Sequence, residues 1–216
     1  MNSFNYYQPT EIIFGCGKIN EIGQKVAEYG MRCLLVTGSK SSVKSPVYEK
    51  VKENLRKEGV KVFHFDKVVE NPTTDVVDEG SEIVKDNNID VIVGLGGGSS
   101  MDTAKAIAVG ATHEGCAWDY KLFSTKKITE KVLPIIAVTT TSGTGSQVTA
   151  VSVITNSNEK LKYALYDKQI FPKVAIIDPE IMMTVPEHIT ASTGFDTFCH
   201  AFEGYIHKDS IRILIF

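Results

Sequence analysis

Two stretches of this 216-residue chain carry residue types whose spacing suits chemistry, and the first is a run of glycines and hydroxyls. Val91 to Leu95 is an apolar run, and Gly96-Gly-Gly-Ser-Ser100 follows it directly. Glycines let backbone N–H groups approach an anion, and the start of a following helix adds partial positive charge. We therefore predict a nucleotide-phosphate site here, with Ser99 and Ser100 capping the helix or donating to phosphate oxygens. A tight strand-to-helix turn without a ligand is the alternative.

The second stretch pairs a carboxylate with an imidazole. Asp196 and His200 are four residues apart, so a helix would place them on one face, one turn apart. A carboxylate oxygen and an imidazole nitrogen so placed can bind one divalent metal ion. Glu203 lies one turn further and is a weaker candidate for supporting such ligands. Spacing alone favours the plainer alternative, a surface or capping pair that binds no metal.

Two further loops extend the candidate site. Thr139-Thr-Thr-Ser-Gly-Thr-Gly145 follows another apolar run and predicts either a second wall of the nucleotide site or an ordinary polar turn. Gly38-Ser-Lys-Ser-Ser42 follows the run Cys33 to Thr37 and contains no carboxylate. An NAD site of the Rossmann type uses an acidic residue there to bind the ribose 2′-hydroxyl. One cation among three hydroxyls predicts a preference for NADP over NAD, and an exposed turn is the alternative.

The elements that must position these loops alternate between strand and helix. Apolar strands without polar alternation are typical of a parallel sheet covered on both faces, which predicts an α/β, doubly wound fold. Ligands of such sheets lie beyond the carboxyl ends of the strands, where this chain keeps its glycines and hydroxyls. The predicted strands cover residues 11–14, 33–37, 60–65, 91–95, 133–138 and 174–177, and the predicted helices begin near residues 19, 46, 73, 100 and 191.

Composition excludes several classes of protein. The chain is 43% hydrophobic and 23% charged, which excludes disorder, and its net charge of −3 gives no footprint for nucleic acid. No apolar run is long enough to span a membrane. No secretion signal precedes the first strand, and the four cysteines are scattered, so we expect a cytoplasmic protein with reduced thiols.

Four ordered motifs together resemble the iron-containing (group III) alcohol dehydrogenase family, in particular its NADPH-dependent butanol dehydrogenases. The motifs are Glu70-Asn-Pro-Thr73, Gly94 to Asp102, Thr139 to Ser146 and Ser192 to Tyr205. The resemblance implies a dinucleotide-binding α/β domain of the dehydroquinate synthase type over residues 1–185. Residues 186–216 would then begin an all-helical domain that binds metal and substrate.

The resemblance also implies roles for individual residues. Asp196 and His200 would be the first two metal ligands, for Fe²⁺ or for Zn²⁺. The bound metal would act as a Lewis acid while hydride passes between NADP(H), or NAD(H), and a primary alcohol such as butanol. A homodimer is expected, and no catalytic protein base stands out. The nucleotide contacts would be Gly38, Ser39, Asn71, Gly97, Gly98, Ser99, Asp102, Thr139, Thr140 and Lys162.

The sequence departs from the family pattern in its last residues. The family binds its metal with one aspartate and three histidines, and two of those histidines would lie beyond residue 216. A one-base deletion in codons for Asn-Pro-Tyr-Thr-Asp-Ile-Phe yields Ile211-Arg-Ile-Leu-Ile-Phe216, so we expect a frameshift that truncated the product; a natural short form is the alternative. The isolated chain is then expected to be inactive. Alternative functions are a non-catalytic nucleotide-binding fragment or a relative of glycerol dehydrogenase and dehydroquinate synthase.

Overall fold

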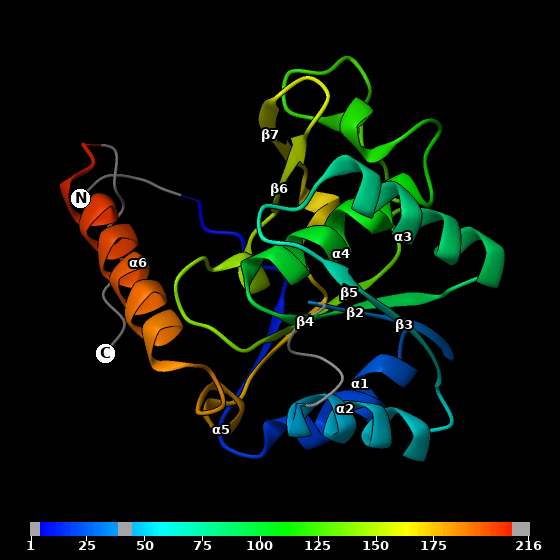
Figure 1. Cartoon of the computed structure of the whole chain (residues 1–216), viewed down its shortest axis with the longest axis vertical. Coiled ribbons are helices and arrows are strands. Elements are labelled where there is room, and N and C mark those ends of the chain that lie inside the picture. Colours follow the sequence, from blue (N-terminus) through cyan, green and yellow to red (C-terminus); the bar gives the residue numbers. More distant parts are fainter. Residues whose placement is uncertain (1–4, 39–44, 209–216) are drawn as a thin grey trace.

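A single parallel sheet organises the chain. The computed structural model describes residues 5–38 and 45–208. All neighbouring strands of the main sheet are parallel, in the spatial order β1-β8-β5-β4-β2-β3 (Figure 1). The strands are β1 (Glu11–Phe14), β2 (Arg32–Gly38), β3 (Lys61–Val68), β4 (Val91–Gly96), β5 (Ile135–Thr139) and β8 (Val174–Ile177).

Helices cover both faces of this sheet. One face carries α1 (Ile22–Ala27) and α2 (Pro46–Lys57), and the other carries α3 (Thr74–Asn87) and α4 (Gly98–Gly110) (Figure 1). Successive side chains of a strand point to opposite faces. Leu35 accordingly belongs to the core under α1 and α2, whereas Leu34 belongs to the core under α3 and α4. The predicted doubly wound α/β fold is confirmed.

Helix α4 is the central helix of the fold and is buried almost all round. Ten of its 13 residues are buried, which explains why it is rich in alanine and lacks a polar face. Gly94 on β4 permits this close packing, because a Cβ atom there would lie 3.1 Å from the Ala104 Cβ. Gly80 on α3 does the same, since its Cβ would lie 2.3 Å from the Ile107 Cδ1.

A two-stranded antiparallel hairpin, β6 (Val151–Asn156) and β7 (Leu161–Tyr166), lies outside the main sheet and was not predicted. It packs on α4, and the segment after β3 joins its edge through a Thr155 N–H that donates to the Pro72 carbonyl at 2.7 Å. The hairpin therefore brings residues 151–166 to the carboxyl-end edge of the sheet.

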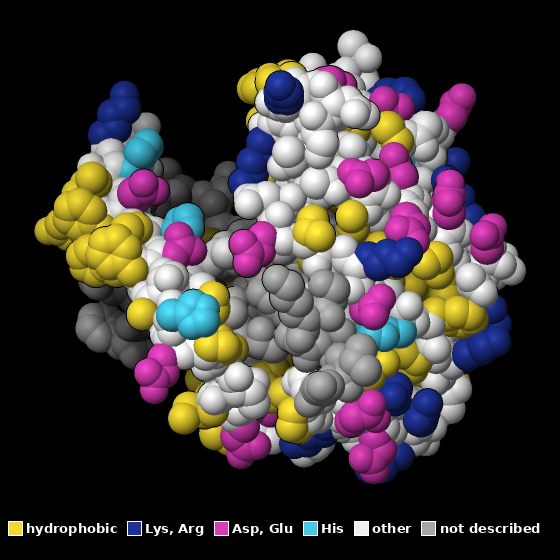
Figure 2. All heavy atoms as spheres, viewed as in Figure 1, with side chains coloured by type: hydrophobic (Ala, Val, Ile, Leu, Met, Phe, Trp, Pro, Cys, Tyr) yellow, Lys and Arg dark blue, Asp and Glu magenta, His cyan; other side chains and the backbone are white. Residues whose placement is uncertain are grey.

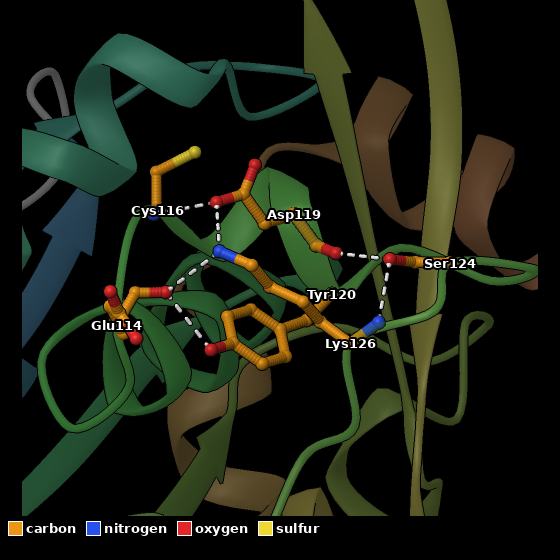
Figure 3. Close-up of polar contacts among 6 residues, drawn as sticks. All are labelled: Glu114, Cys116, Asp119, Tyr120, Ser124 and Lys126. Atoms are coloured by element: carbon orange, nitrogen blue, oxygen red, sulfur yellow. Dashed lines mark hydrogen bonds and ion pairs between the residues drawn. The ribbon is translucent and has the colours of Figure 1, made fainter.

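The loop between α4 and β5 supports this hairpin. The Lys126 ammonium group donates to the Asp119 carboxylate at 2.8 Å and to the Glu114 carbonyl at 3.2 Å, which closes the loop on itself (Figure 3). Within this closed stretch, the Leu122 N–H donates to the Ala164 carbonyl on β7 at 2.7 Å. The loop thus supports β7 through this backbone hydrogen bond.

The last described helix, α6 (Glu187–Ile206), stands at the side of the molecule (Figure 1). It follows the short helix α5 (Pro179–Met182), and none of its residues is buried. Hydrophobic side chains gather on its outer side in Figure 2; the exposed aromatic residues of α6 are Phe195, Phe198, Phe202 and Tyr205. The helix predicted around Asp196 exists, and a domain boundary near residue 186 stays a prediction. Across residues 5–38 and 45–208, no helix is long and apolar enough to cross a membrane.

Candidate nucleotide and metal site

A cavity of about 450 Å³ lies beside the carboxyl-end edge of the sheet. Its walls come from the segment after β3, the start of α4, the loop after β5, the β6–β7 hairpin and α6. Seven of the predicted site residues line it: Asn71, Gly98, Ser99, Asp102, Lys162, Asp196 and His200. Residues from both predicted stretches, nearly 100 positions apart, therefore face the same space.

The start of α4 forms the end of the cavity that suits phosphate. The helix begins at Gly98, and its N-cap is Gly97, which provides no side-chain cap. The expected cap from Ser99 or Ser100 was wrong, because the helix begins earlier and includes both serines in its first turn. Uncapped amides at a helix start bind anions well. A side chain at Gly98 would collide with the neighbouring loop, since its Cβ would lie 2.8 Å from the Thr144 Cγ2.

The loop after β5 lies against this helix start but uses its first two threonines internally. The Thr139 side chain is fully buried, and its hydroxyl donates to the Thr141 carbonyl at 2.7 Å. The Thr140 N–H donates to the Gly96 carbonyl at 3.0 Å, which ties the loop to β4. Neither Thr139 nor Thr140 lines the cavity, and Thr144 and Ser146 of the same loop do.

Asn71 and Lys162 meet on the wall of the cavity. The Lys162 Nζ donates to the Asn71 Oδ1 at 2.7 Å, although the two residues are 91 positions apart. Asn71 has a φ of 54°, a left-handed conformation that asparagine adopts more readily than most residues. This turn directs the segment after β3 toward β7 and leaves a cationic group on the cavity wall.

Asp102 lies deeper and is already well supplied with hydrogen bonds. Its carboxylate accepts from the Ser146 hydroxyl at 2.7 Å and from the Val153 N–H at 3.0 Å. Burial raises the pKa of this carboxyl group above its usual value, against the lowering effects of the Ser146 hydrogen bond and the Lys105 charge. Asp102 thus joins α4 to the loop after β5 and to β6, a role in shaping the cavity.

Asp196 and His200 lie one turn apart on α6. The Asp196 Oδ1 is 3.6 Å from the His200 Nε2, and both side chains are about half exposed. The loop after β5 can approach α6 closely at Gly143 because this residue has no side chain: a Cβ there would lie 2.7 Å from the Asp196 Oδ2. A carboxylate and an imidazole at this spacing fit two positions around Fe²⁺ or Zn²⁺. Within the described part of the chain, no cluster of three or more such groups completes a metal site.

Gly38 and Ser39 were predicted to contact the ribose end of the nucleotide, and neither is found on the described wall of the cavity. Gly38 ends β2, where it pairs with Val68, and does not line the cavity. Ser39 lies outside the described residues. Gly97, the N-cap of α4, does not line the cavity either, and a Cβ there would lie 3.2 Å from the Thr141 Oγ1.

Sequence reasoning missed several residues that build the cavity. Ser146, Thr149, Val151 and Val153 line it, and Lys105 is buried behind them. A signal existed for the hairpin, because Val151 to Asn156 and Leu161 to Tyr166 are rich in β-formers around a polar turn. Nothing in the sequence indicated that Lys105 would be buried.

Comparison of the sequence with known proteins identifies a family. The sequence model for iron-containing alcohol dehydrogenases matches residues 9–179. The chain is 41% identical to choline dehydrogenase of Bacillus subtilis (strain 168), over 96% of this chain and 52% of that protein. It is 37% identical to the NAD-dependent methanol dehydrogenase of Bacillus methanolicus, over 97% of this chain and 54% of that protein.

Solved structures agree with the sequence comparisons. An archaeal halo-thermophilic alcohol dehydrogenase from a Red Sea brine pool has a TM-score of 0.90 and 43% identity, over 95% of this chain and 53% of that one. The NADH-dependent butanol dehydrogenase A of Thermotoga maritima has a TM-score of 0.89 and 37% identity, over 95% and 52%. The chain spans about half the length of these relatives. With its family match, its parallel sheet and its glycine-rich helix start, this chain belongs to the iron-containing alcohol dehydrogenase family.

Proposed function

We propose that this chain is the nucleotide-binding part of a metal-dependent alcohol dehydrogenase that transfers hydride between NADP(H) and a primary alcohol or its aldehyde. One observation carries the proposal: the uncapped start of α4 and the Asp196–His200 pair face one cavity. A phosphate site and a candidate metal site on the walls of one cavity suit a reaction between a nucleotide and a metal-held alcohol.

The chain's own residues bind and orient in this proposal. The first amides of α4, at Gly98 and Ser99, hold the pyrophosphate. Lys162, held by Asn71, supplies a positive charge to the nucleotide. Asp196 and His200 would hold the metal ion, which supplies Lewis-acid activation of the alcohol oxygen when bound. Asp102 holds α4, the loop after β5 and the β6–β7 hairpin together through its hydrogen bonds to Ser146 and Val153.

The nucleotide site is tested by titrating the chain with NADPH and following nicotinamide fluorescence. Lys162→Ala removes the cationic wall and should weaken binding by about tenfold, as expected for losing a charge-assisted hydrogen bond. Lys131→Ala is the matched control, because Lys131 does not line the cavity. Absence of NADPH binding by the unaltered chain, or equal affinities of the two variants, would overturn the assignment.

The choice of NADP over NAD rests on the end of β2. Gly38 has no side chain and the following residues Ser39 to Ser42 carry no carboxylate, which suits a 2′-phosphate. Several relatives are named as NAD- or NADH-dependent, so the comparison of the two nucleotides is decisive. We expect NADPH to bind more tightly than NADH and Gly38→Asp to reverse the order. Tighter NADH binding by the unaltered chain contradicts this part of the proposal.

The metal site is tested by equilibrium dialysis with Zn²⁺. Two protein ligands should bind weakly, and Asp196→Ala and His200→Ala should each remove that binding, whereas His188→Ala on the same helix should not. With two described ligands, we propose that the 216-residue chain by itself reduces no butanal with NADPH. Measurable turnover by the purified chain would contradict this.

The substrate and the oligomeric state of the whole enzyme are also proposed. Relatives are named for choline, methanol, butanol and 1,3-propanediol. We propose a short primary alcohol such as butanol, and a homodimer, for the whole enzyme. Steady-state rates over an alcohol series and light scattering test the two statements separately.

A further inference from the structure

Lys105 on α4 is a fully buried lysine that the proposed chemistry does not use. Its ammonium group has three N–H bonds to satisfy. Three backbone carbonyls accept from it: Ser146 O at 2.7 Å, Val151 O at 2.7 Å and Thr149 O at 2.9 Å. The number of donors therefore matches the number of close carbonyl acceptors.

All three carbonyls belong to one short segment, residues 146–151, and Ser146, Thr149 and Val151 of that segment line the nucleotide cavity. The Ser146 hydroxyl is also 3.0 Å from the Lys105 Nζ and donates to the Asp102 carboxylate. One buried cation thus joins α4 to the wall formed by the segment. A lysine that follows a glycine-rich loop ordinarily suggests a phosphate contact, yet this one does not line the cavity and contacts the residues of its wall instead.

We propose, on the basis of the proposed nucleotide site, that Lys105 is a positioning residue: its ammonium group holds segment 146–151 in the arrangement that binds nucleotide, without touching the nucleotide. The segment has little regular structure of its own, since it contains one 3₁₀ turn, Ser146–Val148. Without the cation, three carbonyls would point at an apolar interior with no donor, and the segment would have to move.

Gln8, in the segment before β1, provides a second hold on the same stretch. Its Nε2 donates to the Val148 carbonyl at 2.9 Å, and its Oε1 accepts from the Thr10 N–H at 3.1 Å. Together, Gln8 and Lys105 engage the carbonyls of residues 146, 148, 149 and 151. Gln8 is only partly buried, so its removal perturbs the segment without disturbing the core.

The protonation state of Lys105 bears on its positioning role. Burial lowers the pKa of Lys105 to about 8, although the Asp102 charge acts in the opposite direction. Asp102 is the charged group that acts on Lys105, and Lys162 on β7 acts in turn on Asp102. A neutral amine has two N–H bonds for three carbonyls, so the hold weakens as the pH rises through about 8.

The experiment compares Lys105→Met, which keeps most of the side-chain length without the charge, with Lys57→Met on the exposed side of α2. Amide hydrogen exchange of residues 146–153 is measured without nucleotide, and NADPH affinity is measured from about pH 7 to about pH 9. For Lys105→Met we expect exchange faster and NADPH binding weaker by at least about tenfold, with no dependence on pH across this range. Lys57→Met should match the unaltered chain, in which affinity falls as the pH rises.

Gln8→Ala keeps the test decisive if Lys105→Met does not fold. It should speed exchange around Val148 and weaken NADPH binding by about threefold, whereas Gln24→Ala on α1 should change neither. Unchanged exchange in Lys105→Met, or unchanged affinity despite faster exchange, would overturn the proposal. If Lys105→Met does not fold, the proposal is overturned when the NADPH affinity of the unaltered chain stays constant between about pH 7 and about pH 9. If the unaltered chain binds no NADPH, the proposed function fails instead, and exchange without nucleotide still shows whether Lys105 holds the segment.

Discussion

Helices α4 and α6 line the same cavity but are held in opposite ways. Ten of the 13 residues of α4 are buried, whereas none of the 20 residues of α6 is. The phosphate end of the cavity therefore takes its geometry from the core of this chain. The Asp196–His200 pair takes its geometry from its own helix and from the approach at Gly143. Nucleotide binding and metal binding should consequently respond very differently to mutation.

The largest expected effect is in α4. Ile107→Ala removes a fully buried side chain that packs against Gly80, and it should lower the free energy of unfolding by about 3 kcal/mol through the cavity it leaves. Urea denaturation followed by circular dichroism measures this. A loss below about 1 kcal/mol would mean that α4 is not the fixed helix of the pair.

The next effect concerns the contact between the β5 loop and α6. Gly143 has a φ of 124°, and its Cβ would also lie 2.9 Å from the Thr193 carbonyl, so Gly143→Ala should cost about 2 kcal/mol. Gly145, with a φ of 64° and open space around it, is the matched control and should cost about 1 kcal/mol. Equal costs in the two variants would show that α6 does not rest on the loop.

A smaller effect is expected at the start of α4. Gly98→Ala brings a methyl group to 2.8 Å from the Thr144 Cγ2 and should weaken NADPH binding by about tenfold while the fold persists. The double variant Gly98→Ala with Thr144→Ala removes most of this collision. Recovery of affinity in the double variant assigns the loss to displacement of the loop, and persistent loss assigns it to the methyl group itself.

The smallest effect is expected on the outer side of α6. Phe198 stacks with Phe195 and Phe202 and remains 60% exposed, so Phe198→Ala should change the free energy of unfolding by no more than about 0.5 kcal/mol. The same urea denaturation serves as the measurement. A loss as large as that of Ile107→Ala would erase the distinction between the two helices.

The sequence predicted the six parallel strands because five contain apolar runs and residues 60–65 alternate between apolar and polar, signals that depend on local residues alone. It missed the β6–β7 hairpin because Ile154 and Leu165 are the fully buried apolar side chains there, too few for a clear periodicity. Glycine runs also blurred one boundary, since α4 begins at Gly98 rather than near Ser100.

The candidate site was predictable where the residues lie within one motif. Gly98 with Ser99, and Asp196 with His200, are neighbours in sequence and remain neighbours in space. The environment of Lys105 was not predictable, because its acceptors lie 41 to 46 positions later in the chain. Thr139 was expected to contact the nucleotide, but its hydroxyl is used inside its own loop.

The order of strands in the sheet has a consequence for biosynthesis. Within the described residues, the strand of the main sheet that is earliest in the chain, β1, pairs with the latest, β8, with Glu11 opposite Val174. At the usual rate of roughly 5–20 residues per second, β1 waits on the order of 10 s for its partner. During that time the apolar side chain of Ile13, which is buried in the folded chain, has no sheet to pack into. Pairing of the edge strand β1 is therefore a late, long-range step in the formation of this sheet.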